Sequence, residues 1–327
     1  MKALITGISG QDGSYLTELL LSKGYEVHGL VRRVSSGYLN LRNIIHLVYD
    51  PDIYRKKLFL HSGDMSDGSS LFRIINEVRP DEIYNLAAQA DVQESFYMPE
   101  YSVEVNGNGL IKILEAVKTI NDKIKVYQAS TSELFGETDE IPQRETTRFN
   151  PQSPYSIGKL VAFQAAKKYR ESYGLFVCNG ILFNHESERR GDDYLTRKVT
   201  KGVGRIVAGL QKNLRLGNLE AKRDWGYSPE FVHAAWLILQ QPNPEDFVIG
   251  TGETHTVQEW VEASFAIAGL DWRDYVIQDP KLFRPAEVNV LQADYSKAKE
   301  KLGWEPQVKF KELVKIMTEY DIRNSRI

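Results

Sequence analysis

Short apolar segments alternate with segments of helical periodicity along the first half of the chain. Six apolar runs bounded by turn residues read as buried strands, at 2–6, 26–31, 58–61, 82–85, 126–129 and 176–182. Apolar positions at helical spacing lie between them, at 16–21 with a stop near Gly24, and at 71–78, 110–117 and 160–173. Because parallel strands need crossover connections, this alternation predicts an α/β fold with a doubly wound parallel sheet of the Rossmann type.

The rhythm changes after Asn184, where the sequence becomes polar and rich in loops. We therefore expect a cofactor domain at 1–183 and a smaller C-terminal substrate domain at 184–327. Thr256, with Glu259 three residues later, predicts a capped helix, and two more helices are expected near 295–302 and 310–320. The apolar segment 231–250 is also compatible with a return to the sheet, so this boundary is not sharp.

Composition narrows the classes of function. Among 327 residues, 41 basic and 44 acidic side chains leave a formal charge of -3, which gives no bulk field for nucleic acid or an anionic membrane. We find no apolar stretch long enough to span a bilayer and no secretory h-region, so we expect a cytoplasmic protein with neither partner. We expect no metal site. The single cysteine, Cys178, lies among apolar neighbours and reads as a buried strand residue.

A glycine-rich turn follows the first strand and opens a helix. Gly7, Gly10 and Gly13, with Gln11 and Asp12 between the last two, would let backbone N–H groups approach a pyrophosphate at the positive end of that helix. The alternative is a tight turn that binds no ligand. Its position after the first strand favours a dinucleotide site.

The residues after the next strands refine that site. Arg32 and Arg33 stand where an NAD enzyme usually carries a carboxylate, and two guanidiniums suit a 2′-phosphate, so we expect NADP. A solvated basic turn is the alternative. We also assign the following residues to the cofactor, the first two beside adenine and the others as a close backbone approach: Asp64, Met65, Leu86, Ala87 and Ala88.

A tyrosine and a lysine are spaced for joint chemistry. Tyr155 and Lys159 lie four residues apart in a segment that Ser153 and Pro154 would start as a helix, so both project from one face. A nearby ammonium lowers the pKa of a phenol and makes it a usable base. A packed tyrosine beside a surface lysine is the alternative, but the preceding βα units favour a catalytic pair.

An additional carboxylate determines the expected reaction. Thr131, Ser132 and Glu133 follow the fifth predicted strand, at the edge of the sheet where ligands of such folds bind. Alcohol oxidation needs only the tyrosine and NADP, whereas Glu133 adds a second acid/base group. The set predicts oxidation, elimination of water and return of the hydride to the same molecule. Alternatively, Glu133 could only compensate a helix dipole.

These motifs resemble the extended short-chain dehydrogenase/reductase family and, within it, the GDP-mannose 4,6-dehydratases. The resemblance covers nearly the whole chain, and its specific segments are 6–16, 27–33, 127–133, 180–187, 196–198, 216–218, 221–226 and 283–288. It implies that Tyr155 deprotonates the C4 hydroxyl while hydride passes to NADP, with Lys159 lowering its pKa. Glu133 would remove the C5 proton and assist loss of the C6 hydroxyl, and Thr131 would bind the sugar near C4.

The resemblance also implies binding roles. Further residues would enclose the cofactor: Ser35, Gln89, Ala90, Tyr101, His185 and Arg190. Others would hold the GDP-sugar: Ser132, Asn184, Lys198, Leu216, Gly217, Lys222, Arg223, Arg284 and Glu287. A structural imidazole is the alternative for His185, and surface ion pairs are the alternative for Arg223 and Arg284. The segment 32–42 is expected to reach a neighbouring subunit's cofactor in a tetramer.

Some loops depart from the family pattern. They are 89–95, 150–153, Glu188 and 226–231, and Ala90 stands where a hydroxyl is usual. Because several should face the hexose, a related substrate such as a GDP-manno-heptose stays open with the same chemistry. An NADP-linked reductase or epimerase of nucleotide sugars does not need Glu133, and a non-catalytic NADP sensor commonly lacks the tyrosine. We therefore favour 4,6-dehydration.

Overall fold

A seven-stranded parallel sheet forms the centre of the computed structural model, which describes residues 1–32, 37–283 and 288–325. Its strands run in the order β11-β6-β5-β4-β1-β2-β3. Their bounds are β1 Lys2–Thr6, β2 Glu26–Val31, β3 Leu58–Ser62, β4 Glu82–Asn85, β5 Lys125–Ala129, β6 Val177–Leu182 and β11 Phe247–Ile249. The order reverses between β1 and β4, and this switch point is where doubly wound sheets bind ligands. The predicted fold class is confirmed.

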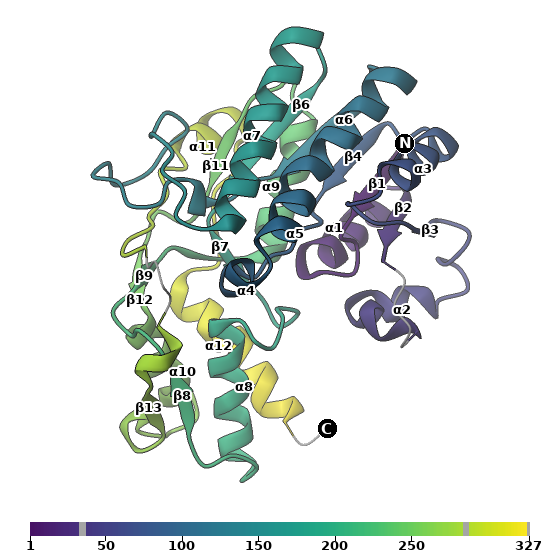
Figure 1. Cartoon of the computed structure of the whole chain (residues 1–327). Coiled ribbons are helices and arrows are strands. Elements are labelled where there is room, and N and C mark those ends of the chain that lie inside the picture. The colour runs from purple at the N-terminus through teal and green to yellow at the C-terminus, as the bar shows by residue number, and fades with distance from the viewer. Residues whose placement is uncertain (33–36, 284–287, 326–327) are drawn as a thin grey trace.

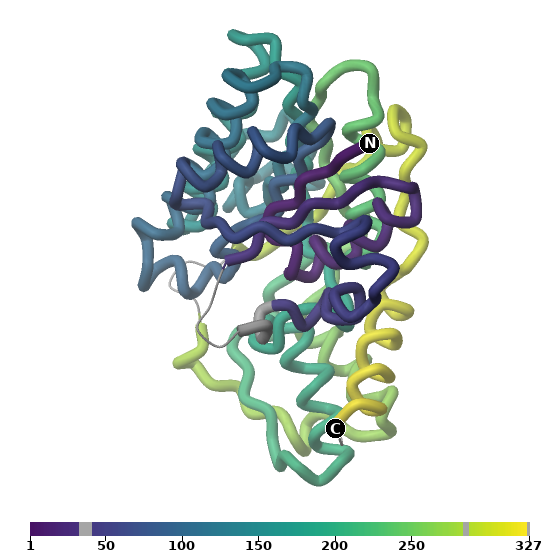
Figure 2. The backbone as a smooth tube through the Cα atoms, turned by 90° about the vertical axis from the view of Figure 1, so that its right-hand side faces the viewer, coloured from purple at the N-terminus to yellow at the C-terminus, as the bar shows by residue number. Residues whose placement is uncertain are grey.

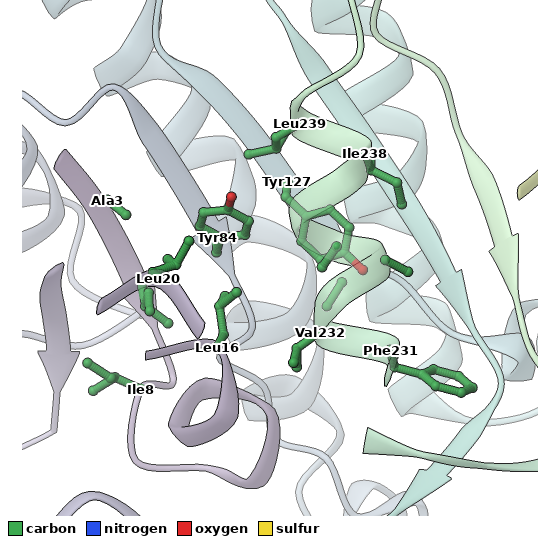
Figure 3. Close-up of a cluster of buried hydrophobic side chains, with 14 of the residues drawn as sticks. Ala3, Ile8, Leu16, Leu20, Tyr84, Tyr127, Phe231, Val232, Ile238 and Leu239 are labelled. Carbon is green, nitrogen blue, oxygen red and sulfur yellow. The ribbon is translucent and has the colours of Figure 1, made fainter. Parts of the chain in front are cut away.

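Helices cover both faces of this sheet (Figure 1). On one face lie α1 Gln11–Ser22 and α9 Ser228–Leu239, and on the other lie α3 Gly68–Val78, α6 Gly109–Ile120 and α7 Pro154–Tyr173. The strands alternate accordingly, since Tyr84 and Tyr127 pack with α1 and α9 whereas Ile83 and Val126 pack with α3 and α6. Figure 3 shows the first cluster, with labelled side chains Ala3, Ile8, Leu16, Leu20, Tyr84, Tyr127, Phe231, Val232, Ile238 and Leu239.

The remaining elements connect the sheet or extend the molecule. Short helices follow β2 and β4: η1 Gly37–Ile44, α2 Ile45–Val48, α4 Val92–Tyr97, α5 Pro99–Val103 and the π-helical turn η2 Glu104–Asn108. The single-turn 3₁₀ segments are η3 Ser132–Leu134, η4 Trp272–Asp274 and η5 Pro280–Leu282. The C-terminal part also contains α8 Leu195–Val207, α10 Val257–Ile267, α11 Ser296–Leu302 and α12 Phe310–Asn324.

A second hydrophobic core holds the lower part of the molecule in Figures 1 and 2. It contains Val199 and Val203 of α8, Trp260 of α10 and Met317 of α12, all fully buried. Three pairs of very short strands surround it: β10 Trp225–Tyr227 with β7 Asn184–Glu186, β12 His255–Thr256 with β9 Lys222–Arg223, and β13 Val276–Gln278 with β8 Leu214–Leu216. These pairs bring separate loops to the carboxyl edge of the large sheet.

The segment 231–250 lies largely with the sheet, because α9 packs on it and β11 pairs in parallel with β6. The chain therefore returns to the first part after entering the second. The division at residue 183 stays a prediction about domains, and it does not follow the packing of this segment.

The predicted strands and helices agree closely with the structure where the sequence pattern is long. Strand bounds differ by no more than one residue at either end, and the capping box of Thr256 and Glu259 is present. The region after Asn184 is less loop-rich than expected, because α8 was not predicted. Cys178 is fully buried in β6, and burial raises the pKa of its thiol to about 12. No helix among the described residues is long and apolar enough to cross a membrane.

Candidate active site

The glycine turn after β1 is shaped by close backbone contacts. A Cβ atom on Gly13 would lie 2.2 Å from the Gly7 carbonyl oxygen, and one on Gly7 would lie 2.9 Å from the amide nitrogen of Ala87. Gly7 also has a φ of 70°, which side chains rarely adopt. The turn therefore sits against Ala87 at the start of the segment after β4, so two residues that were separately assigned to the cofactor lie together. The N-terminus of α1 points out of this turn and provides the positive end expected at a phosphate site.

Asp12 and His185, both predicted to contact the cofactor, contact each other. The Asp12 carboxylate lies 2.8 Å from His185 Nε2 and accepts a 2.8 Å hydrogen bond from Ser228. His185 Nδ1 lies 2.7 Å from the Phe183 carbonyl oxygen. Both ring nitrogens thus face acceptors, which requires a doubly protonated imidazolium.

The charges of this pair agree with that geometry. Burial acts to lower the pKa of His185, but the Asp12 charge and hydrogen bond outweigh it and raise the pKa above 6.5. Burial acts to raise the pKa of Asp12, but the His185 charge and its hydrogen bonds hold it well below 3.8. Gln11 adds a hydrogen bond to the His185 carbonyl oxygen at 3.0 Å. The group ties α1 to the segment after β6.

The far end of the predicted cofactor site is a cavity of about 610 Å³. Its lining residues are Arg32, Ser62, Gly63, Asp64, Asp67, Ser69, Ser70 and Arg73. Arg32 donates a 2.7 Å hydrogen bond to the Tyr101 hydroxyl, which joins two residues assigned to the cofactor. Met65 is buried against α6 in the core rather than exposed to this cavity. Arg33 and Ser35 lie outside the described residues.

The segment after β4 is held by a residue that the sequence analysis missed. Asn106 accepts a 2.9 Å hydrogen bond from the Gln89 amide and donates one of 2.9 Å to its carbonyl oxygen. This buried side chain belongs to the π-helical turn η2, a geometry often found at functional sites. Asn106 therefore fixes the path of the predicted cofactor residues Leu86, Ala87, Ala88, Gln89 and Ala90. A buried asparagine in an apolar helical pattern was the available signal.

Thr131 caps the short helix that carries the predicted second acid/base group. Its hydroxyl accepts a 3.2 Å hydrogen bond from the Glu133 amide. Thr131 and Ser132 are buried, whereas Glu133 is half-buried. The Glu133 carboxylate has no hydrogen bond or ion pair with any part of the chain that the structure describes. It is therefore available to a ligand, which the dipole alternative alone does not require.

The capping box of Ser153 and Ser156 starts α7 and sets the positions of Tyr155 and Lys159. The Lys159 ammonium is buried, donates a 2.7 Å hydrogen bond to the Ala129 carbonyl oxygen and lies 5.9 Å from the centre of the Tyr155 ring. Burial lowers the pKa of Lys159 to about 8. The structure thus places the predicted catalytic pair at the carboxyl end of β5, next to Thr131 and Glu133.

The pKa of Tyr155 differs from the expectation based on sequence. Burial raises it above 10, the nearby Glu133 charge acts in the same direction, and a hydrogen bond from Thr131 lowers it. Lys159 was expected to lower it, but its ammonium is directed to the Ala129 carbonyl. The sequence pattern gives the spacing of Tyr155 and Lys159 but not the burial of the phenol. The expected lowering of the Tyr155 pKa was therefore wrong for the protein alone.

Arg190 and Tyr194 complete one wall of the site. The Arg190 guanidinium stacks 3.8 Å from the centre of the Tyr194 ring, and its Nε lies 3.2 Å from the buried Glu186 carboxylate. The charges of Arg190 and Tyr194 both act on Tyr155, so they lie near the phenol. Tyr194 was not predicted, because it precedes a helix that the sequence analysis did not identify.

The predicted substrate residues come from several short elements. Asn184 is in β7, Lys198 in α8, Leu216 in β8 and the pair Lys222 and Arg223 in β9, with Gly217 directly after β8. The Lys198 ammonium has no ion pair within the described ranges. Arg223 is buried and donates a 2.7 Å hydrogen bond to the Val288 carbonyl oxygen. Arg284 and Glu287 lie outside the described residues.

The fully buried Asp224 ties these substrate segments together. Its carboxylate accepts hydrogen bonds from the Thr251 amide at 2.8 Å, the Thr251 hydroxyl at 2.7 Å, the Gly252 amide at 2.9 Å and the Ala293 amide at 3.0 Å. Burial raises its pKa to about 6, while these hydrogen bonds act in the opposite direction. Within the described ranges, no group of three His, Cys, Asp or Glu side chains could hold a metal ion.

Comparisons with known proteins agree with this arrangement. Residues 4–317 match the family model for GDP-mannose 4,6 dehydratase. GDP-mannose 4,6 dehydratase 2 of Arabidopsis thaliana is 55% identical over 325 residues, 98% of this chain and 86% of that protein. The human GDP-mannose 4,6 dehydratase is 50% identical over 344 residues, 99% of this chain and 92% of that protein. Among solved structures, a dTDP-glucose 4,6-dehydratase from Streptomyces venezuelae with NAD bound is similar, with a TM-score of 0.85, 25% identity and coverage of 99% and 98%.

Proposed function

The chain belongs to the GDP-mannose 4,6-dehydratase family, and we propose that Thr131, Glu133, Tyr155 and Lys159 share its chemistry. The protein converts GDP-mannose to GDP-4-keto-6-deoxymannose by internal hydride transfer with loss of water. This membership confirms the dehydratase hypothesis made from the sequence over the reductase and sensor alternatives. The role of each side chain is our proposal.

We assign the proton transfers to two neighbouring groups. A nicotinamide dinucleotide held by the glycine turn after β1 and the segment after β4 would supply the hydride acceptor, the returning hydride and a positive ring charge that favours the phenolate of Tyr155. Tyr155 takes the C4 hydroxyl proton, and Thr131 positions that hydroxyl. Glu133 takes the C5 proton and gives it to the C6 hydroxyl, which leaves as water; after hydride returns to C6, the proton held by Tyr155 passes to C5. Lys159 stays hydrogen-bonded to the Ala129 carbonyl and orients Tyr155, the proton acceptor.

The observation that carries this proposal is the unpaired Glu133 carboxylate beside Tyr155. Its charge acts on the pKa of the phenol, and it has no hydrogen-bonding or ionic partner among the described residues. An oxidation alone would need only Tyr155. A second carboxylate, close enough for its charge to act on the phenol, is what an elimination next to the new ketone requires.

Substitution of Glu133 by glutamine tests the proposal. Glu133→Gln should lower the turnover of GDP-mannose by ~10²–10⁴-fold, the usual scale for an acid/base group. Binding of GDP-mannose, measured by calorimetry, should change little because the shape is kept. Glu171→Gln is the matched control, since this carboxylate is exposed on the distant end of α7. An unchanged rate in Glu133→Gln would contradict the assigned role.

We further propose NADP as the cofactor. Arg32 lines the cavity after β3 together with Ser69, Ser70 and Arg73 of α3. The cavity therefore offers two guanidiniums and the N-terminus of α3 to a 2′-phosphate. Arg73 was not named from the sequence. Equal dissociation constants for NAD and NADP would contradict this proposal. The tetramer that the resemblance implies stays a prediction, which light scattering of the protein in solution can test.

A further inference from the structure

A long connection joins the turn that carries Glu133 to the helix that carries Tyr155. The turn η3 ends at Leu134, and α7 is capped by Ser153. We call residues 136–152, which lie between them, the arm. None of the roles proposed above falls on the arm, although it is attached to both proton-transfer groups.

The first residues of the arm are fixed relative to η3. The Asn150 amide donates a 2.8 Å hydrogen bond to the Leu134 carbonyl oxygen, and the Asn150 side chain donates one of 3.0 Å to the Glu137 carbonyl oxygen. Between them, Gly136 has a φ of 55°, and a Cβ on it would lie 1.8 Å from the Asn150 carbonyl oxygen. Glu137 therefore has a defined place next to the turn of Glu133.

The Glu137 carboxylate reaches a segment from the other half of the molecule. Its Oε1 atom accepts a 2.7 Å hydrogen bond from the Asn289 amide and one of 3.2 Å from the Asn289 side chain. The Asn289 carbonyl oxygen accepts a 2.9 Å hydrogen bond from the Lys222 amide, and the preceding Val288 carbonyl accepts one of 2.7 Å from Arg223. Lys222 and Arg223 form β9, the strand assigned to the substrate. A continuous series of hydrogen bonds thus runs from β9 to the turn of Glu133.

Other contacts hold the arm and β9 in place independently of Glu137. Gln143 is fully buried, its amide donates to the Gln292 carbonyl oxygen at 2.8 Å, and its side-chain oxygen accepts from the Gln292 amide at 2.8 Å. The strand β9 pairs with β12. Loss of the Glu137 carboxylate should therefore detach neither the arm nor β9, and should change only the link beside Glu133.

We propose that Glu137 is a positioning residue for the elimination, which holds the turn of Glu133 in register with the strand that binds the GDP part of the substrate. This inference rests on the proposed function. The bound GDP determines where C5 and the C6 hydroxyl of the sugar lie, and Glu137 determines where the Glu133 carboxylate lies against them. Oxidation at C4 depends less on this link, because Tyr155 belongs to α7, which has its own capping box.

The expected size of the effect follows from the geometry of proton transfer. A misplacement of about 1 Å at a reacting group can cost roughly a hundredfold in rate. The turn stays anchored by the buried side chains of Leu134 and Phe135, so the displacement should be smaller. We expect a loss of about tenfold in the elimination step.

The variant Glu137→Ala tests the inference, and its fold can be checked by thermal unfolding because Glu137 is exposed. The kcat for GDP-mannose should fall by about tenfold, while the Kd of GDP, measured by calorimetry, should change by less than about twofold. Since oxidation continues while elimination is slowed, reduced nicotinamide should accumulate during turnover and be seen by its absorbance. A loss of structure alone would not cause this accumulation. Glu137→Gln keeps an acceptor oxygen and should recover most of the rate.

Glu140→Ala is the matched control on the same arm. The Glu140 carboxylate pairs with Arg144 of the arm at 2.8 Å, and it has no hydrogen bond or ion pair with the described residues 288–294. Its kcat should therefore stay close to that of the wild type, without accumulation of reduced nicotinamide.

Four outcomes would overturn the inference. They are an unchanged kcat in Glu137→Ala, an equal loss in Glu140→Ala, a loss without accumulation of reduced nicotinamide, and a Kd of GDP that rises as much as kcat falls. The third would place the effect on oxidation and the fourth on binding. Failure of the proposed function itself would appear in the wild type, as no 4-keto-6-deoxy product without added reductant, and would overturn both. Failure of this inference alone leaves wild-type turnover and the loss in Glu133→Gln intact.

Discussion

The glycine turn at residues 7–13 and the cluster around Asp224 position two parts of the same site by different means. In the turn, backbone approaches backbone so closely that a Cβ on Gly13 would lie 2.2 Å from a carbonyl oxygen. In the cluster, one carboxylate gathers the backbone of two distant segments, at 251–252 and at Ala293. The first depends on the absence of side chains and the second on the presence of one. The same edge of the sheet is therefore vulnerable to added volume at one place and to lost charge at the other.

The largest effect on stability should follow removal of the Asp224 carboxylate. Asp224→Ala leaves the buried amides of Thr251, Gly252 and Ala293 without their acceptor. Each orphaned group costs about 1–3 kcal/mol, so the free energy of unfolding should fall by about 3 kcal/mol or more. Urea denaturation measures this loss. Asp122→Ala, at an exposed carboxylate, should change it little. Similar values for the two variants would show that the cluster does not hold these segments.

A smaller effect should follow added volume in the turn. Gly13→Ala forces the backbone of residues 7 and 8 to move, which costs about 1–3 kcal/mol. Cofactor binding, followed by fluorescence titration, should weaken more than stability does, because the displaced amides are those proposed to face the pyrophosphate. In the control Gly68→Ala, the new methyl would have its nearest neighbour at 3.5 Å. Normal cofactor affinity in Gly13→Ala would contradict the idea that the glycine turn, unlike the Asp224 cluster, depends on the absence of side chains.

The smallest effect should come from pH, through the Asp12–His185 pair that lies next to the turn. The pKa of His185 is raised on folding, so its contribution to stability is complete below 6.5 and is lost as pH rises through the folded value. The pKa of Asp12 is lowered, so its contribution is present above 3.8 and is lost at more acidic pH. The stability difference between the wild type and His185→Gln should therefore narrow as pH rises above 6.5 and through the folded pKa of His185.

His46→Gln provides the control for this pH series. His46 is half-exposed and pairs with Glu18 at the surface, so removing its side chain should change the free energy of unfolding little. A stability difference for His185→Gln that stays constant over the same range would mean that the imidazole is neutral in the folded protein. In that case one of its two ring nitrogens would have to give up its acceptor.

The turn could be predicted from the sequence and the cluster could not, for a physical reason. Gly7, Gly10 and Gly13 act over seven consecutive residues, so their spacing alone carries the geometry. Asp224 acts on Thr251 and Ala293, and nothing in its immediate neighbours specifies these partners. For the same reason the long strands of the sheet were found within one residue, whereas strand pairs of two or three residues were not.

Helix α8 shows a different limit. Val199, Val203 and Ile206 have helical spacing, but buried polar residues such as Arg197 and Thr200 lie among them and weaken the apolar pattern. Missing this helix also hid Tyr194, which directly precedes it. Asn106 escaped for a related reason, because the π-helical turn around it shifts the helical period by one residue.

The return of β11 to the sheet has a consequence for synthesis of the chain. Its partner β6 ends at Leu182 and β11 begins at Phe247, 65 residues later. At translation rates of roughly 5–20 residues per second, the growing chain presents β6 as an open edge for roughly 3–13 s. Open strand edges pair readily with other chains. The nascent protein thus passes through an interval in which the edge of β6 is open to pairing with other chains until β11 covers it.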